Sequence, residues 1–520
     1  MKNASSAAPL QLTAGLRRFL YFTAAVTGAA ILVVEILGAK MLSPYVGSSH
    51  FVWTAQIAVT LVSLALGYYF GGWLVDRSAD LQRLYKCIAI AALYLAATVP
   101  FVEKVAYAFL NFKLEMGAFL ASNFLFLVPL TLLAATGPFL IRVLTQSVQN
   151  IGGQVGRLSA VSTLGSVIGT ILIGYLLLPY LANSTTMFVT AGTLLALAII
   201  YFAVWARGQS SLAVTIGLGA LFLMGSLLIR DKFTAQPRSM VRLYSGNSNF
   251  GQIQVLEHKN SHRRYYLNDY LVQNTYDSQE KASMSLFTYM LHELAWAYSP
   301  SLKNALCIGL GIGIVPGALA REGVQVDVVE INPAIVPVAK KYFDFDDSAV
   351  NVTIGDGRFF INKSQKKYDA IVLDAFLGDS SPSHLMTREA FAEMARLLGT
   401  NGVLVINSFG DFRPGRDFFL SSLDKTLRSV FKQVHIHASG NGNVFFAASQ
   451  RELILKPRDQ VHFASHADLE SQFSAAMAFA PPPNSANGIV LTDDFNPVDF
   501  YDAANRERHR RAMALAIREL

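Results

Sequence analysis

The stretch Ala305-Leu-Cys-Ile-Gly-Leu-Gly-Ile-Gly313 decides the fold of the C-terminal half of this chain. Its apolar start predicts a buried strand, and its three glycines predict a tight turn directly after that strand. A second apolar run follows at Gln325–Glu330 and ends in an acid. A glycine-rich turn after one strand and a carboxylate after the next are typical of a nucleotide site.

Strand and helix patterns alternate around this turn. Alternation of this kind predicts a Rossmann-like α/β domain, with a mainly parallel sheet and helices on both faces. We expect strands at Ala305–Gly309, Gln325–Glu330, Val350–Ile354, Tyr368–Asp374, Gly402–Ser408, 434–438 and Val444–Ala448. Helices are expected from about 314, from 333 and around 387–398.

A different pattern precedes the first of these strands. Polar and apolar residues alternate over 249–257, 263–268 and 271–275, which predicts a small antiparallel β-meander. A helix is expected to follow over roughly 279–297. The C-terminal half therefore begins with a meander that leads into the α/β domain.

The N-terminal half has the composition of a membrane domain. Of the 520 residues, 52% are hydrophobic and 15% are charged, and the apolar excess lies before residue 231. About 20 apolar residues cross a bilayer as a helix, so we expect a multi-pass α-helical membrane domain with the lipid bilayer as a partner. The seven expected spans are roughly 17–40, 51–75, 84–102, 117–141, 157–181, 185–206 and 211–230. The first is too long for a cleavable signal peptide.

The distribution of basic residues gives conflicting topologies. If the N-terminus is cytoplasmic, most of the basic residues between the spans also lie on the cytoplasmic side, which favours that orientation. Seven spans would then place the C-terminal half outside, whereas four basic residues between 230 and 242 favour the inside. Either one span around 103–145 is miscounted or the charge rule fails. We expect a cytoplasmic C-terminal domain on the cell (inner) membrane, because the nucleoside substrate predicted below is cytoplasmic.

The role of one ionisable residue in the apolar half is undecided, while several features of the composition exclude functions. Glu35 lies within the first span, where an ionisable residue usually faces a bundle interior or an aqueous path. A purely structural role, with Thr54, Thr60 or Arg142 as its partner, is the alternative. Glycines on several spans predict close helix packing.

The net charge of +7 comes without a basic run, so no nucleic-acid partner is expected. Two cysteines and the pair His435 and His437 predict no disulfide framework and no metal site.

The ends of four successive strands carry the functional residues. The glycine turn permits close approach of the backbone to a ligand, and Glu330 can accept hydrogen bonds from a ribose diol. Asp356 ends the third strand, where it can hold an adenine amino group, and Asp374 ends the fourth. This order predicts an adenosyl-sulfonium site, with a nicotinamide dinucleotide site as the main competitor. The glycines of the turn are Gly309, Gly311 and Gly313, and Gly357 follows Asp356.

At these residues the chain resembles the spermidine synthase (polyamine aminopropyltransferase) family over about residues 248–450. The segment Tyr266–Gln273 is similar to the family's Leu-Asp-Gly-X-X-Gln motif, and Tyr289 lies near the position of the family's active-site tyrosine. The segments Asp374–Thr387 and Thr492–Pro497 resemble the membrane-fused branch of the family. The resemblance implies a class I methyltransferase-type fold and a transferase of polyamine biosynthesis.

The resemblance also implies roles for individual residues. Asp374 is expected to be the catalytic base, with Tyr289 orienting the amine or relaying its proton. Gln273, the glycines of the turn, Glu330, Asp356 and Gly357 are expected to bind decarboxylated S-adenosylmethionine, or S-adenosylmethionine itself. The residues expected to contact the amine substrate are Asp277, Asp379, His384, Asp493 and Asp494.

Three departures from the family leave the reaction open. Ile312 and Leu377 stand where soluble spermidine synthases have aspartates that bind ammonium groups, and Tyr270 replaces a glycine. An ion-paired hydrogen bond contributes roughly 1.5–3 kcal/mol, so both losses weaken amine selectivity. Aminopropyl transfer to an amine is the first expectation. An S-adenosylmethionine-dependent methyltransferase, and a polyamine transporter or sensor with a non-catalytic nucleoside domain, are the alternatives.

These patterns divide the chain into four parts. We expect a transmembrane domain over 1–232, a meander over 233–278 and the sulfonium-nucleoside transferase domain over 279–450. Residues 451–520 are expected to form a linker and a helix that carry the Thr-Asp-Asp segment. A homo-oligomer is possible, and the acceptor amine is not specified by any of these patterns.

Overall fold

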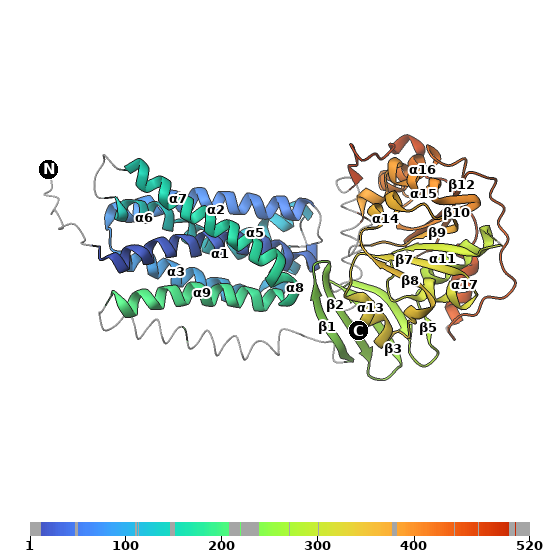
Figure 1. Ribbon diagram of the computed structural model, residues 1–520, viewed down its shortest axis with the longest axis horizontal. Coiled ribbons are helices and arrows are strands. Elements are labelled where there is room, and N and C mark those ends of the chain that lie inside the picture. Colours follow the sequence, from blue (N-terminus) through green and yellow to red (C-terminus); the bar gives the residue numbers. More distant parts are fainter. Residues whose placement is uncertain are drawn as a thin grey trace. The chain divides into compact units, whose positions relative to one another are not determined.

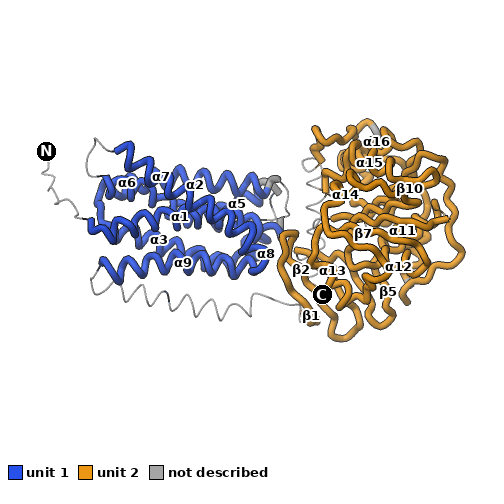
Figure 2. The backbone as a smooth tube through the Cα atoms, viewed as in Figure 1, with its two compact units in different colours: residues 1–235 blue, residues 236–520 orange. Residues whose placement is uncertain are grey.

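The computed structural model divides into two compact units, residues 1–235 and 236–520 (Figure 2). It describes residues 12–46, 50–109, 112, 114–145, 151–206, 219, 239–269, 271–299, 301–376, 382–440, 442–465, 467–498 and 505. The expected span 211–230 lies outside the described residues, as do Tyr270, Leu377 and Asp379.

The first unit is a bundle of helices (Figure 1). Its elements are α1 (Ala14–Val46), α2 (His50–Arg77), α3 (Leu81–Thr98), α4 (Val102–Phe109), α5 (Leu114–Ala134), α6 (Thr136–Leu144), α7 (Ile151–Leu172), α8 (Leu178–Tyr180) and α9 (Asn183–Val204). A π-helical segment, Ile173–Leu177, joins α7 to α8. Within the described residues, five stretches are long and apolar enough to cross a membrane, and a sixth is obtained if α3 and α4, bent by 71°, form one span. The expected span 84–102 falls on this bent pair.

Small residues bring the helices of the first unit into close contact. A Cβ atom added at Gly165 or Gly169 of α7 would overlap the backbone of α1 at Ala25 or Ala29. Gly67 of α2 faces α5 in the same manner. These glycines therefore serve helix packing as expected, whereas a Cβ at Gly174 would meet no neighbour.

The second unit begins with a five-stranded antiparallel sheet in sequential order. Its strands are β1 (Met240–Ser248), β2 (Gly251–His258), β3 (Arg263–Asn268), β4 (Leu271–Asp277) and β5 (Ala282–Ser283). The helix expected from about 279 begins later, as α11 (Leu286–Tyr298), because Ala282 and Ser283 pair with β4. The meander thus has two strands more than the three that its polar–apolar alternation predicts, because β1 precedes them and β5 follows them.

A seven-stranded mixed sheet follows, with the order β11-β12-β10-β9-β6-β7-β8. Its strands are β6 (Asn304–Ile308), β7 (Gln325–Glu330), β8 (Asn351–Ile354), β9 (Tyr368–Leu373), β10 (Leu398–Phe409), β11 (Gln433–Ala438) and β12 (Asn443–Ser449). The strands β6 to β10 pair in parallel, and β12 runs antiparallel to both of its neighbours. This is the Rossmann-like arrangement expected from the alternating patterns.

Alternate residues of the central strands supply two hydrophobic cores. In β9, Ala370 and Val372 belong to the core shared with α11, α12 (Ile314–Arg321), α13 (Ile335–Tyr342) and α17 (Ala467–Ala476). Ile371 and Leu373 belong to the core on the other face. That core is shared with α14 (Gly357–Lys363), α15 (Arg388–Leu397) and α16 (Phe418–Arg428). The strand order reverses beside β6, so a ligand crevice is expected at the carboxyl ends of β6 and β9.

Candidate active site

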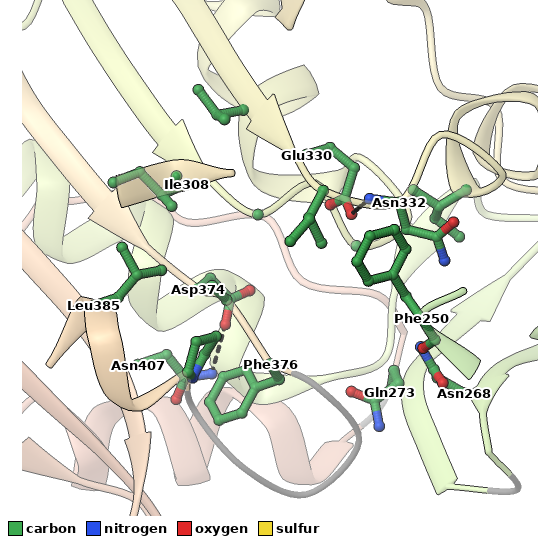
Figure 3. A pocket seen from close by; sticks show the side chains of 18 of the residues that line it. Phe250, Asn268, Gln273, Ile308, Glu330, Asn332, Asp374, Phe376, Leu385 and Asn407 are labelled. Atoms are coloured by element: carbon green, nitrogen blue, oxygen red, sulfur yellow. Dashed lines mark hydrogen bonds between the residues drawn. The ribbon is translucent and has the colours of Figure 1, made fainter. Parts of the chain in front are cut away.

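A pocket lies at the carboxyl ends of the parallel strands, where the strand order reverses (Figure 3). Residues from the ends of β6, β7, β9 and β10 line it, together with residues from the meander sheet. Three of its described lining residues are acids, one is histidine, and none is lysine or arginine. A cavity with this composition favours a cationic ligand over an anionic one.

The glycine-rich turn forms the floor of the pocket. Gly309 and Gly311 line it, and their φ angles of +100° and +55° lie in the region that favours glycine. A Cβ atom at Gly309 would overlap the main-chain carbonyl of Asp374. Gly313, with a φ of +84°, begins α12 and is not among the lining residues. Two of the three expected glycines therefore meet the cavity, and the third shapes the turn.

Glu330 is held at the end of β7 by backbone amides. One carboxylate oxygen accepts a hydrogen bond from the amide of Leu310 and the other from the amide of Asn332, each at 2.8 Å. Burial raises the pKa of Glu330, and these amides oppose that effect. Each carboxylate oxygen retains a second lone pair, so a ribose diol can still donate to the pair of oxygens.

Asp356 and His384 form a polar pair at the rim of the pocket. One oxygen of Asp356 caps α14 by accepting a hydrogen bond from Phe359 N at 2.9 Å. The other oxygen lies 3.0 Å from Nε2 of His384. Gly357 follows directly, and a Cβ there would lie 2.6 Å from the Ile308 side chain. His384, assigned in the sequence to substrate contact, thus lines the pocket beside the adenine candidate.

Asp374 follows β9 and is held by a relay of side-chain amides. Asn407 of β10 donates from Nδ2 to Asp374 Oδ1 at 2.9 Å, and Asn443 donates from Nδ2 to Asn407 Oδ1 at 3.0 Å. Burial raises the pKa of Asp374 to about 6, and the hydrogen bond from Asn407 opposes this rise. A carboxylate with this pKa is suited to accept a proton near neutral pH.

Sequence reasoning missed both asparagines of this relay. Asn407 lies near the carboxyl end of β10, so the strand-end rule that identified Glu330 would also have identified it. Asn443 begins the antiparallel strand β12, which runs in the opposite direction and escapes that rule.

Aromatic and amide side chains complete the lining. Phe250 of the meander lies near Glu330, and Phe376 lies near Asn407, on opposite sides of the cavity (Figure 3). Gln273 lines the pocket from β4 as expected. Asn268 lines it too, and its buried Oδ1 has no hydrogen-bond partner among the described residues. An unpaired buried acceptor facing a cavity is available to a ligand donor.

Other sequence candidates lie outside the described lining of the pocket. The Tyr289 hydroxyl donates to the Ser283 carbonyl at 2.7 Å and accepts from Ala464 N at 3.2 Å. These bonds join α11 to β5 and to the C-terminal segment. The structure therefore does not bring Tyr289 to Asp374, because its position on α11 directs the hydroxyl to the start of the helix.

Three acids assigned to substrate contact are also absent from the described lining. Asp277 accepts hydrogen bonds from the amides of Gln279 and Glu280 in the turn after β4. Asp493 pairs with Arg358 at 2.8 Å and accepts from Thr387, which ties the C-terminal segment to α14 and α15. Asp494 follows it and is exposed.

Ile312 occupies the turn position where the family resemblance implied an aspartate. Its side chain is buried in the core and lines a small cavity that also touches Asp374. Asn274 and Thr288 are polar members of that lining, and Ile312 adds no charge to it.

Comparisons with known proteins agree with this geometry. Residues 284–439 match the Spermine/spermidine synthase domain. The polyamine aminopropyltransferase of Vibrio vulnificus is 39% identical over 156 residues, which are 29% of this chain and 50% of that protein. The N-terminal histidine N-methyltransferase of Emericella nidulans is 38% identical over 135 residues, 25% of this chain and 23% of that protein.

More distant relatives cover more of their own length. A polyamine aminopropyltransferase of Clostridium botulinum is 24% identical over 222 residues, 40% of this chain and 76% of that protein. A solved spermidine synthase of Thermotoga maritima has a TM-score of 0.37 and 20% identity, covering 46% of this chain and 84% of that one. The chain spans about half the length of the Vibrio relative. The C-terminal part therefore contains a spermidine synthase domain whose homologues are polyamine aminopropyltransferases.

Proposed function

We propose that this chain is a membrane-anchored aminopropyltransferase, which moves an aminopropyl group from decarboxylated S-adenosylmethionine to an amine. The observation that carries the proposal is the pocket at the strand ends, with three acids and no lysine or arginine among its described lining residues. Both the sulfonium donor and an amine acceptor are cations in solution, and such a pocket attracts them. The match to the spermine/spermidine synthase domain supports the same reaction.

The proposed roles follow from position in the pocket. Glu330 accepts hydrogen bonds from the ribose diol, Asp356 holds the adenine amino group, and Gly309 and Gly311 leave room for the sulfonium. Gln273 lies on the thioether side. The amine nitrogen attacks the methylene carbon next to sulfur, the carbon–sulfur bond breaks, and its electron pair leaves on the thioether.

Proton transfer is assigned to Asp374. The attacking amine must be neutral, because an ammonium group has no lone pair. Asp374, ionised above a pKa of about 6, accepts the proton that the nitrogen loses. Asn407 stabilises the ionised form by donating to its Oδ1. General-base help of this kind is worth about 10²–10⁴-fold in rate.

The membrane placement is part of the proposal. The helical unit exposes large apolar side chains on its outer faces, including Leu61 at 60%, Tyr69 at 79% and Leu164 at 61%. Water disfavours a surface of this kind, and lipid accommodates it. We place the transferase domain on the cytoplasmic side of the cell membrane, where its nucleoside donor is found.

A methyltransferase is the second candidate function. Ile312 lies beside Asp374 in place of an ammonium-binding carboxylate, and the Emericella relative is a histidine N-methyltransferase. The two reactions share the nucleoside half of the pocket. They differ in the group that leaves the sulfonium, and hence in the thioether that remains.

Turnover of a labelled donor tests the proposal. The full chain, purified in detergent, is incubated with decarboxylated S-adenosylmethionine carrying ¹⁴C in its aminopropyl group and with a panel of primary diamines. We expect the label to move to a diamine. Absence of transfer to every amine tested, with S-adenosylmethionine consumed in a parallel incubation, would assign the chain to methyl transfer.

A further inference from the structure

The helical unit contains a second polar region, centred on Glu35 of α1. Its side chain lies near Thr60 of α2, whose hydroxyl donates to the Gln56 main-chain carbonyl at 3.0 Å. None of the ion pairs between described residues involves Glu35. A carboxylate inside an apolar helix bundle is costly, and such residues usually mark a site or an aqueous path. Glu35 therefore requires an explanation beyond the neighbouring Thr60 hydroxyl.

Gln56 lies one turn before Thr60 on the same helix. Its side chain is fully buried, and neither its Nε2 nor its Oε1 has a hydrogen-bond partner among the described residues. A Cβ atom added at Gly38 would lie 2.9 Å from Gln56 Nε2. The amide therefore lies against α1, one turn from Glu35. Leaving a buried polar group unpaired costs about 1–3 kcal/mol, so an unpaired amide beside a carboxylate points to a ligand.

A further unpaired hydroxyl lies at the same level of the bundle. Ser63 of α2 donates to the carbonyl of Leu127 on α5. A residue of α5 therefore lies at about the height of the α2 residue whose number is lower by 64 (127 − 63). The same offset places Ser122 beside residue 58, between Gln56 and Thr60. The Ser122 side chain is fully buried, and its Oγ has no partner among the described residues.

The π-helical segment lies at this level as well. Gly165 faces Ala25 and Gly169 faces Ala29, so α7 and α1 run in parallel with an offset of 140 (165 − 25 and 169 − 29). The same offset places Ile173–Leu177 beside residues 33–37 of α1, and this segment packs against α1. Isolated π turns inside α-helices occur frequently at functional sites.

We propose that this level of the helix bundle binds the ammonium group of an alkylamine. Glu35 neutralises its charge, while the Gln56 carbonyl oxygen and the Ser122 hydroxyl accept its N–H donors. The need for a cation follows from these side chains alone. The choice of an amine rests on the proposed function, because the transferase would consume one.

Carbodiimide labelling of Glu35 tests the proposal without reading transferase activity. Dicyclohexylcarbodiimide activates carboxyl groups in apolar surroundings, and mass spectrometry quantifies the unmodified Glu35 peptide, so that the N-acylurea and the amide formed with the diamine both count as labelling. The full chain in lipid nanodiscs is labelled with 1,4-diaminobutane, with sodium chloride, or with choline chloride, whose cation has no N–H donor. We expect only the diamine to protect Glu35, by about tenfold, as a charge-assisted hydrogen bond allows.

Two substitutions in the helical unit and one in the transferase pocket sharpen this test. Gln56→Leu removes the amide acceptor and should abolish protection by the diamine while Glu35 still labels. Glu103→Gln, which removes a carboxylate at an exposed residue of α4, should leave protection unchanged. Protection should persist in Asp374→Asn, which separates this site from the transferase pocket. Equal labelling in all three solutions, or protection by sodium alone, would overturn the proposal.

Discussion

The nucleoside end of the pocket, at Glu330 and Asp356, and its transfer end, at Asp374, hold their carboxylates by different means. Backbone amides fix the acids of the nucleoside end, since Glu330 accepts from two amides and Asp356 caps α14. At the transfer end, Asp374 is held by the Asn407 side chain and lies beside the buried Ile312. Backbone contacts survive most substitutions and side-chain contacts do not. The transfer chemistry can therefore change while nucleoside binding is retained.

The largest effect that separates the two ends is expected from Asp374→Asn. This change removes the proposed base while keeping the shape of the side chain, so turnover should fall by about 10²–10⁴-fold. Affinity for 5′-methylthioadenosine, measured by calorimetry, should stay close to that of the wild type. Asp459→Asn, the same change at an exposed residue, is the matched control. Full turnover in Asp374→Asn would remove this residue from the mechanism.

Glu330→Gln should have the converse effect. It weakens charge-assisted hydrogen bonds to the ribose, worth roughly 1.5–3 kcal/mol, so the affinity for 5′-methylthioadenosine should fall by about 10–100-fold. The turnover number at saturating donor should change much less. Equal affinity for the nucleoside in variant and wild type would show that the ribose does not bind at Glu330.

Asn407→Leu should move the pH dependence at the transfer end. Asp374 must be ionised to act as a base, so activity falls as the pH drops through its pKa of about 6. The substitution removes a hydrogen bond that favours the ionised form, so the acid limb of kcat should move to higher pH by about 1–2 units. Nucleoside affinity at pH 8 should not change. A drop in kcat that is equal at every pH would indicate a purely structural role.

The smallest effect is expected from Tyr289→Phe. Its hydroxyl bonds Ser283 and Ala464 outside the described lining of the pocket, so kcat should be unchanged. Loss of these two bonds should lower the free energy of unfolding by about 0.5–1.5 kcal/mol, read from chemical denaturation. A fall in kcat comparable to that of Asp374→Asn would restore the catalytic role that the sequence suggested.

The predicted site residues that the structure brings to the pocket share one physical property. Gly309, Glu330, Asp356 and Asp374 each follow a parallel strand, and the carboxyl ends of such strands meet at one edge of the sheet. The strand patterns alone therefore bring these residues together. The same reasoning predicts the order of elements, since apolar runs and glycine turns are local features of the sequence.

The remaining placements depend on tertiary contacts that local patterns do not encode. The direction of the Tyr289 side chain follows from where α11 begins, which the pairing of β5 with β4 sets. The pairing of Asp493 with Arg358 depends on the return of the C-terminal segment to α14. Asn443 reaches Asn407 only because β12 pairs antiparallel with β10. None of these three is visible from spacing along the chain.

The thioether nucleoside formed by the full chain tests the central claim most directly. The protein receives equal concentrations of S-adenosylmethionine and its decarboxylated form, together with a mixture of amines, and the nucleoside product is identified by mass. Aminopropyl transfer predicts 5′-methylthioadenosine, whose formation Asp374→Asn should suppress. Accumulation of S-adenosylhomocysteine instead would contradict aminopropyl transfer and identify the chain as a methyltransferase.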